Sequence, residues 1–372
     1  MKTPFNREAT REATFVIAAA DSTTESKAQA DSVCHGVDDD VVIQDAIDNL
    51  PAGGGKIYLL AGNYSISDTI LIDGGTYISG DGRTATIITL ANNSDCDMFQ
   101  PRDQANGCHR AMFEHFMVDG NKDNQSAGNG FYGRFYNCYF NDLEVESVYT
   151  WGFYAYATDV TPGWGAQENV WNNSYFWRSG AGSLRFSPYG SDNWINKVSS
   201  WNSYGTEDVL IEGGMNKLTN CGFFGTFLTM PNSDYGIHIV GGAFLNTVLN
   251  CTIDTFKKHG IFLDANVTTI AFTDISHNLV RSVSKETNNT YDGIHLGNAT
   301  MNGVIYGRVI GNMYHAGWLT LPNKPAYAIR LTGANANFNV VQQNMSCPGD
   351  YVTGNVGLVA AGANNDVAHN IP

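Results

Sequence analysis

The chain has 372 residues and a formal net charge of −15; only 15% of its residues are charged, whereas 40 are Gly and 12% are aromatic. Such acidity argues against a nucleic-acid partner, because phosphate binding needs concentrated Lys and Arg. No segment approaches the roughly 18 consecutive apolar residues of a membrane span, and seven Cys in so long a chain do not make a disulfide scaffold.

Residues 1–37 are polar and are predicted as an N-terminal lead-in with room for one strand. They show no recognisable signal peptide, because no apolar core of the required length is present. A leader removed beforehand, or exit from the cell by another route such as virus assembly, would explain this. We therefore expect an extracellular or virion-associated location.

Residues 38–372 are predicted as a single domain that begins with an amphipathic helix over about 39–50. Asp38, Asp39 and Asp40 stand at its start, where Asp suits an N-cap and the helix dipole. Pro51 and the glycines after it end the helix. One helix ahead of a repetitive β domain is expected to cover the open apolar end of the repeat.

Short strand-like runs separated by Gly and Asp turns follow. In order, residues 39–82 contain the helix, Pro-x-Gly-Gly-Gly-Lys-Ile-Tyr-Leu, Gly-x-Tyr-x-Ile, Thr-Ile and Ile-Ser-Gly-Asp-Gly. This run resembles the opening of right-handed parallel β-helix proteins of the pectate-lyase-like superfamily, and residues 117–121 resemble its second or third rung. The resemblance implies the fold for nearly the whole chain. It implies no single activity, since the superfamily holds lyases, hydrolases, epimerases, viral tailspikes and inert fibres.

The catalytic motifs of the superfamily are missing from this sequence. The Gly-His-Gly signature of the hydrolases, Arg-x-Pro-x-x-Arg of the lyases and Asp-Pro-His of the alginate epimerases are absent; residues 258–260 and 235–238 come nearest to the first and the last. No catalytic residue is therefore assigned by motif.

Eight four-residue segments share one template, in which the second and fourth residues are apolar and the third varies. This is the alternation of a strand with two inward side chains. The segments begin 24 to 35 residues apart, a period typical of repeat architectures. They are residues 152–155, 183–186, 208–211, 236–239, 260–263, 293–296, 328–331 and 357–360. With the resemblance, they predict an all-β, single-stranded right-handed parallel β-helix.

A second track of residue pairs between these segments predicts turns in which Asn bonds backbone and adopts the left-handed conformation. The pairs begin at residues 137, 173, 220, 250, 277, 311, 343 and 369. We accordingly expect two strands per turn of the solenoid.

The Cys residues of this track, Cys138, Cys221 and Cys251, are interpreted as a ladder of small buried side chains rather than metal ligands. No pair of Cys has the spacing of a zinc knuckle, so no metal site is predicted. The sequence leaves open a disulfide among Cys34, Cys96 and Cys108. The Asp-rich turn over residues 119–124 is compatible with Ca²⁺ but lacks a bidentate Glu, and a solvated turn is the better interpretation.

Six of the seven Trp lie between residues 151 and 201, together with many Tyr. Any single Trp of this stretch fits the solenoid interior, but the clustering favours a carbohydrate groove, because aromatic faces suit the apolar faces of sugar rings. Tyr154, Tyr156, Trp177 and Trp201 are the predicted substrate-binding aromatics.

Equivalent positions in successive rungs stack about 4.8 Å apart. The outward third position of the template gives Tyr154, Arg185, Leu210, His238, Phe262, His295, Arg330 and Val359. Two residues further on, the column is Tyr156, Ser187, Glu212, Val240, Asp264, Gly297, Thr332 and Ala361. Two Arg and two His on one stripe of an acidic chain suit an anionic ligand such as a uronate polymer.

Two mechanisms fit these columns. In β-elimination, Arg185 or Arg330 would neutralise the substrate carboxylate. His238 or His295 would act as the base that removes the proton beside it. Tyr154 or Tyr156 would act as the acid that protonates the leaving oxygen. In glycoside hydrolysis, Glu212 and Asp264, two rungs and about 9.6 Å apart, would form the carboxylate pair, near the upper end of the roughly 6.5–9.5 Å window of inverting enzymes.

The sequence thus predicts a β-helix that binds a polysaccharide, preferably an anionic one, and cleaves it. Ordinary solvated residues on an exposed sheet face are the competing interpretation of the columns. A non-enzymatic tailspike or surface fibre component is the rival function. A monomer and a homotrimer both fit the sequence.

Overall fold

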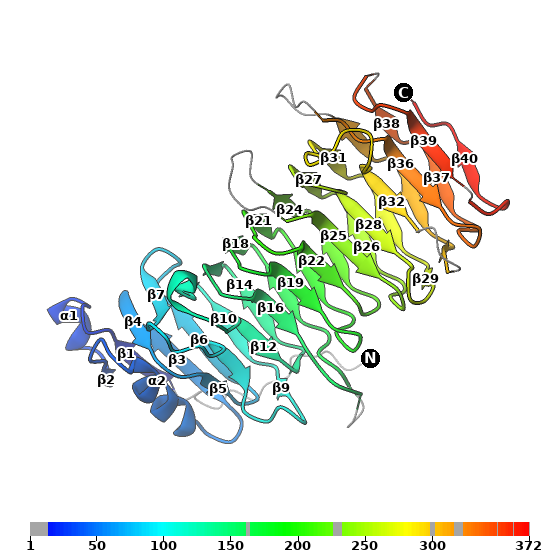
Figure 1. The fold of residues 1–372 in the computed structure, drawn as a ribbon. Helices are drawn as coiled ribbons and strands as arrows, with labels where there is room; N and C mark the ends of the chain where they lie inside the picture. The colour runs from blue at the N-terminus through cyan, green and yellow to red at the C-terminus, as the bar shows by residue number, and fades with distance from the viewer. Residues whose placement is uncertain are drawn as a thin grey trace.

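The computed structural model describes residues 14–160, 164–225, 233–297, 302–315, 323–347, 349–359 and 361–371. Over these residues the chain winds into a solenoid of three long parallel sheets, here called A, B and C, that run along its length (Figure 1). Each turn adds one strand to A, then B, then C, and neighbouring strands pair in parallel. The predicted parallel β-helix is confirmed, with three strands per turn instead of two. Most turns between sheets A and B are only two residues long, so the sequence pattern did not separate the strands of these two sheets.

Sheet A contains, in spatial order, β2 (Ser32–Val33), β1 (Thr14–Ala18), β3 (Gly55–Leu59), β6 (Thr76–Gly80), β10 (Met112–Glu114), β14 (Tyr139–Asn141), β17 (Val170–Asn172), β20 (Trp194–Asn196), β23 (Lys217–Thr219), β26 (Thr247–Leu249), β30 (Asp274–Ser276), β34 (Arg308–Ile310), β37 (Val340–Gln342) and β40 (Asp366–Ala368). Sheet B contains β4 (Gly62–Ile66), β7 (Thr86–Leu90), β11 (Met117–Asp119), β15 (Glu144–Glu146), β18 (Tyr175–Trp177), β21 (Ser199–Trp201), β24 (Gly222–Phe224), β27 (Thr252–Asp254), β31 (Leu279–Arg281), β35 (Met313–His315) and β38 (Met345–Ser346). Sheet C contains β5 (Ile70–Ile72), β8 (Phe99–Pro101), β12 (Phe131–Gly133), β16 (Trp151–Ala155), β19 (Gly182–Phe186), β22 (Glu207–Ile211), β25 (Tyr235–Val240), β28 (Ile261–Asp264), β32 (Ile294–Leu296), β36 (Tyr327–Thr332) and β39 (Gly354–Val359). Two further pairs are β9 (Cys108–His109) with β13 (Phe135–Tyr136) and β29 (Ile270–Ala271) with β33 (Val304–Ile305).

Seven of the eight template segments, and residues 357–359 of the eighth, lie along sheet C, in the strands from β16 to β39; residue 360 lies outside the described residues. The predicted register holds through Arg330, which pairs with Gly357 in β39. Val359 was therefore placed wrongly: it pairs with Thr332, two residues along the strand. The template misplaced it because Gly357 is followed by two further apolar residues that fit the pattern equally well.

The predicted helix is α2 (Asp39–Asp48), which lies at the N-terminal end of the solenoid (Figure 1). It buries Ile43, Ala46 and Ile47 in the core. Asp38 occupies the N-cap position in a left-handed conformation without capping a helical N–H, so the expected side-chain cap is wrong. Instead, Asp39 accepts the backbone N–H groups of His35 and Gly36 at 2.9 and 2.8 Å, which fastens the helix to the preceding loop.

The segment before α2 belongs to the same sheet system. Strand β1 pairs with β3 and β2 pairs with β1, so sheet A begins ahead of residue 38. The described part of the chain contains two further helices, α1 (Thr24–Lys27) and η1 (Lys122–Asn124). Among the described residues, no helix is long and apolar enough to cross a bilayer.

From β10 onward, turns between sheets A and B have two residues, the first with positive φ and the second mostly buried. Seven of the eight predicted pairs lie in these turns; the exception begins at Asn137, which precedes β14 and sheet A. Buried Asn side chains stack along them: Asn278 donates to Asn312 Oδ1 at 2.9 Å, and Asn312 donates to Asn344 Oδ1 at 3.0 Å. Such ladders satisfy backbone groups that the turns would otherwise leave buried without partners.

Much of the aromatic-rich middle is core. Trp171 is fully buried and stacks on Phe140 with ring centroids 4.4 Å apart, and Trp151 is nearly buried. Because Cys138 lies before sheet A, it does not share a ladder with Cys221 and Cys251. Its thiol instead contacts the Cys108 carbonyl at 3.4 Å. The three Cys left open as disulfide partners, Cys34, Cys96 and Cys108, are free.

Candidate functional site

The outer face of sheet C holds the predicted column in register. Tyr154 pairs with Arg185, and the column continues through Leu210, His238, Phe262, His295 and Arg330 on successive strands. The parallel ladder aligns residues whose sequence positions differ by about one turn of the solenoid. We call this surface the sheet C face.

At the N-terminal part of the sheet C face, Arg185 is already paired. Its Nε lies 2.9 Å from Glu212 Oε2 and its Nη2 3.3 Å from Oε1, and its guanidinium lies 4.5 Å from the centre of the Tyr154 ring. Tyr156 packs beside Tyr154, with ring centroids 5.3 Å apart. Burial raises the pKa of Tyr154, so this phenol keeps its proton to higher pH than an exposed one.

His238 lies in the middle of the sheet C face between two carboxylates. Its Nδ1 is hydrogen-bonded to Glu207 Oε1 at 3.0 Å, and its Nε2 lies 3.8 Å from Asp264 Oδ2 and makes no hydrogen bond. Phe262 stacks on the imidazole at 5.1 Å. Burial alone would lower the pKa of His238, but the Asp264 and Glu207 carboxylates stabilise the imidazolium and raise its pKa above the usual value.

The next polar group toward the C-terminus surrounds Asp292, whose side chain is fully buried. Arg330 Nη2 lies 2.9 Å from Asp292 Oδ1, which also accepts the Tyr327 backbone N–H at 3.1 Å. His295 Nδ1 lies 3.0 Å from Asp292 Oδ2, and His295 Nε2 is hydrogen-bonded to Thr332 Oγ1 at 3.1 Å. Both ring nitrogens of His295 therefore face protein groups.

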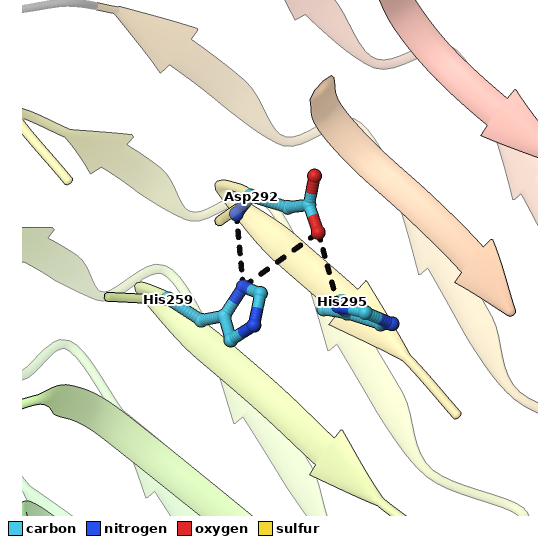
Figure 2. Close-up of side chains that lie close together, drawn as sticks. All are labelled: His259, Asp292 and His295. Carbon is cyan, nitrogen blue, oxygen red and sulfur yellow. Dashed lines mark hydrogen bonds and ion pairs between the residues drawn. The ribbon is translucent and has the colours of Figure 1, made fainter. Parts of the chain in front are cut away.

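His259 stands beside the same carboxylate (Figure 2). Its Nδ1 accepts the Asp292 backbone N–H at 2.9 Å and lies 3.7 Å from Asp292 Oδ2. Burial, reinforced by the positive charge that His295 can carry, holds the pKa of His259 well below its usual value. His259 is therefore neutral where ordinary His side chains titrate.

The predicted substrate-binding residues do not form one surface. Trp177 and Trp201 lie on strands β18 and β21 of sheet B, with ring centroids 6.4 Å apart, whereas Tyr154, Tyr156 and Arg330 belong to the sheet C side. A single groove containing all five is not formed. The sequence did not show that these aromatic residues lie on two different sheets, because it predicted two strands per turn and not the third strand that forms sheet B.

Four residues of this site were not predicted from the sequence: Glu207, His259, Asp292 and Tyr235. The Tyr235 ring centroid lies 4.9 Å from that of His238. Each stands three residues before a member of the outward column, and Glu207 pairs with Tyr235 on the neighbouring strand. The sequence could have revealed them, because each of the four residues directly precedes a template segment and so recurs with the same period. The template itself began one residue later and did not include them.

The carboxylates of the Asp-rich turn over residues 119–124 are engaged by neighbouring protein groups. Asp119 Oδ1 accepts the Asn121 backbone N–H at 2.9 Å, and Asp123 Oδ1 accepts a hydrogen bond from Lys122 Nζ at 2.9 Å. An ammonium group thus occupies one of the oxygens that an ion would need.

Comparisons with known proteins agree with this architecture. Residues 22–137 match the family described as rhamnogalacturonase A/epimerase, pectate lyase-like. Mannuronan C5-epimerase AlgE1 of Azotobacter vinelandii is 37% identical over 99 residues, which cover 24% of this chain and 7% of that protein. Alginate lyase 7 of the same organism is 32% identical over 135 residues, covering 31% and 16%. The chain therefore spans less than a fifth of the length of either relative.

Among solved structures, the A-module of mannuronan C-5 epimerase AlgE6 of Azotobacter vinelandii matches 90% of this chain and 96% of its own, with TM-score 0.54 and 17% identity. A tailspike protein of E. coli bacteriophage HK620 in complex with a pentasaccharide matches 86% and 62%, with TM-score 0.55 and 17% identity. The surface protein and adhesin PfbA of Streptococcus pneumoniae matches 90% and 96%, with TM-score 0.51 and 12% identity. At these identities the structural likeness establishes the fold.

Together, the fold and the family match define the class: this is a parallel β-helix protein. The resemblance to the pectate-lyase-like right-handed parallel β-helix superfamily, stated above on residues 39–82, is confirmed. The residues around His238 lie beyond the part of the chain that the family match covers.

Proposed function

We propose that the sheet C face binds an anionic, uronate-containing polysaccharide and that His238 removes the proton beside the uronate carboxylate. The observation that carries the proposal is the His238–Glu207 pair, in which Nδ1 is held by a carboxylate and Nε2 has no hydrogen-bond partner. An imidazole held in this way presents Nε2 as a base of raised strength. The names of the relatives, which concern mannuronan epimerisation and alginate cleavage, support a uronate polymer as substrate.

The chemistry proposed is β-elimination. Nε2 of His238 takes the C5 proton, the electron pair forms a C4–C5 double bond, and the C4–oxygen bond breaks. The leaving oxygen takes a proton from Tyr235, whose ring centroid lies 4.9 Å from that of His238. Tyr154 and Tyr156 cannot supply it, because Tyr154 lies three strands, about 14 Å, from His238 along sheet C. Arg185, two strands from His238, would neutralise the substrate carboxylate once it is released from Glu212, which makes the C5 proton acidic. Arg330, three strands from His238 and paired with Asp292, would bind the carboxylate of a neighbouring sugar.

Access to His238 sets a condition on this proposal. The Nε2 atom is buried beneath the carboxylate of Asp264, 3.8 Å away. Substrate must therefore displace the Asp264 side chain, whose Oδ1 is held by the Asn266 backbone N–H at 3.0 Å. His295 is the weaker candidate base, since its Nε2 is hydrogen-bonded to Thr332 and its Nδ1 faces the buried Asp292 carboxylate rather than the surface.

Hydrolysis by Glu212 and Asp264 is the second candidate mechanism, and one contact weighs against it. A carboxylate of the catalytic pair must offer an oxygen to water or to the glycosidic oxygen, whereas both oxygens of Glu212 accept hydrogen bonds from Arg185. The non-enzymatic rival, a virion or surface fibre component, has support from the tailspike and adhesin structures that share the fold. A monomer and a homotrimer remain the expected assemblies, outside the cell or on a virion.

The test is incubation with polymannuronate, polyguluronate and polygalacturonate, following ultraviolet absorbance of unsaturated product and release of reducing ends. β-Elimination raises both, hydrolysis raises reducing ends alone, and a fibre component raises neither. We expect both to rise, and His238→Gln to lower the rate by about 10²–10⁴-fold, the contribution of a general base. His277→Asn, at an exposed turn position with positive φ, is the matched control and should keep full activity.

A further inference from the structure

Three potential metal ligands from two successive turns of the solenoid converge at His259, Asp292 and His295 (Figure 2). His259 lies just before β28, Asp292 just before β32 and His295 within β32. The ligand atoms, His259 Nδ1, Asp292 Oδ2 and His295 Nδ1, lie within 4.8 Å of one another, and all three residues are buried.

Two of these atoms lack the partners that buried polar atoms need. Asp292 Oδ1 is engaged by Arg330 and by the Tyr327 N–H, but Oδ2 accepts no hydrogen bond. His295 Nδ1 makes none either, although it lies only 3.0 Å from that oxygen. Unsatisfied buried atoms are rare in native proteins, and two that face each other indicate a missing positive group between them.

We propose that His259, Asp292 and His295 bind one divalent transition-metal ion, with Zn²⁺ the best fit. Two imidazoles and one carboxylate form a donor set that Zn²⁺ favours, and three protein ligands leave a fourth position for water or another ligand. Tetrahedral ligands at about 2.0–2.1 Å from the ion lie roughly 3.3 Å apart. The separations of Asp292 Oδ2 from His295 Nδ1 and His259 Nδ1, 3.0 and 3.7 Å, bracket that value.

The surroundings suit such an ion. Thr332 Oγ1 can accept a hydrogen bond from His295 Nε2–H, and in that tautomer Nδ1 keeps its lone pair for the metal. Arg330 fixes the carboxylate through Oδ1 and leaves Oδ2 directed at the two imidazoles. One rearrangement is needed: His259 Nδ1 accepts the Asp292 N–H at 2.9 Å and must turn its ring slightly to offer its lone pair to the ion. Nitrogen donors favour Zn²⁺ or a similar metal over Ca²⁺, which prefers oxygen.

The site would tie the turn that contains β28 to the turn that contains β32, so the ion should stabilise the fold whether or not the protein has an activity. The test uses the whole chain, stripped of metal with a chelator and titrated with Zn²⁺ by calorimetry. We expect one ion per chain at this site and a higher melting temperature. Thr332→Val removes a hydrogen-bond partner of a ligand and should weaken Zn²⁺ binding about 10–100-fold. Substituting a ligand itself, as in His259→Gln or His295→Gln, should weaken Zn²⁺ binding at least about 100-fold.

A second group of potential ligands, His315, Cys347 and Asp350, provides the control. His315→Gln should leave the proposed site intact. Co²⁺ bound to wild-type protein should give the strong visible bands of a tetrahedral ion without thiolate-to-metal charge transfer, a result that does not depend on any variant folding. Failure of wild-type protein to bind Zn²⁺, binding lost in His315→Gln but kept in His259→Gln, or a thiolate spectrum would each overturn the proposal.

Discussion

His238 Nδ1 lies 3.0 Å from Glu207 Oε1, across the neighbouring strands β25 and β22 of sheet C. The hydrogen bond joins residues 31 positions apart that the solenoid brings onto adjacent rungs. Because Glu207 is hydrogen-bonded to Nδ1, the other nitrogen, Nε2, faces Asp264. The proposed removal of the C5 proton by Nε2 depends on this orientation of the imidazole.

Replacing Glu207 by Gln should lower the pKa of His238, since one of the two carboxylates that raise it is removed. A His whose pKa is raised by folding stabilises the protein below its unfolded pKa of about 6.5. That stability is lost as pH rises through the folded pKa. The melting-temperature gap between wild type and Glu207→Gln should therefore be largest below about pH 6.5 and shrink above the folded pKa. A gap independent of pH, or an NMR titration of His238 that does not move, would contradict this account.

The Arg185–Glu212 pair can be tested with a double-mutant cycle. Both side chains are partly exposed, so we expect a coupling free energy of only about 1 kcal/mol. Arg185→Lys should lose most of the coupling, because an ammonium cannot make both hydrogen bonds. In polymer-binding assays, Arg185→Ala should weaken uronate binding, whereas Glu212→Gln, which frees the guanidinium, should not. Equal weakening in both variants would remove Arg185 from the proposed site.

Asp208 is buried inside the solenoid, where its Oδ1 accepts hydroxyl hydrogen bonds from Ser183, Ser200 and Ser203 at 2.5, 2.8 and 2.6 Å. Burial nevertheless raises the pKa of Asp208. An acid with a raised folded pKa costs the native state stability as pH rises from the unfolded value of about 3.9 through the folded one. Asp208→Asn should therefore gain in melting temperature relative to wild type as pH increases over this range. A constant difference from acidic to neutral pH would show that Asp208 does not titrate as described.

The buried Asn ladder should contribute strongly to stability. Asn312→Ala removes a donor to the Ile275 carbonyl and an acceptor for the Asn278 side chain, both at 2.9 Å. We expect a loss of about 2–4 kcal/mol in the free energy of unfolding, because each unsatisfied buried group costs about 1–3 kcal/mol. Chemical denaturation measures it. Asn370→Ala, at the less buried end of the ladder, is the comparison and should cost about 1 kcal/mol; equal costs would argue against a role for burial.

The repeat made the fold predictable from sequence, and it also explains where prediction stopped. Template segments with two inward apolar residues identified sheet C and placed Arg185, His238 and His295 in one register. The strands of sheet B were not predicted separately, because from β10 onward they follow sheet A after two-residue turns. The sequence therefore did not show that Trp177 and Trp201 lie on a different sheet from Tyr154. Glu207 and Asp292 precede the template segments. The alternation of apolar residues within a strand does not predict where the side chains of the preceding residues point, so their contacts with the His residues could not be predicted.

Proton removal from uronate C5 is the central claim, and solvent deuterium exchange tests it most directly. Wild-type protein incubated with polymannuronate, polyguluronate or polygalacturonate in D₂O should deplete the C5 proton signal in NMR spectra, either as unsaturated product or as exchanged sugar. His238→Gln should slow this at least about 10²-fold, and the folded His277→Asn control should match wild type. Full depletion by His238→Gln, or chain cleavage that leaves every C5 proton in place, would contradict the account.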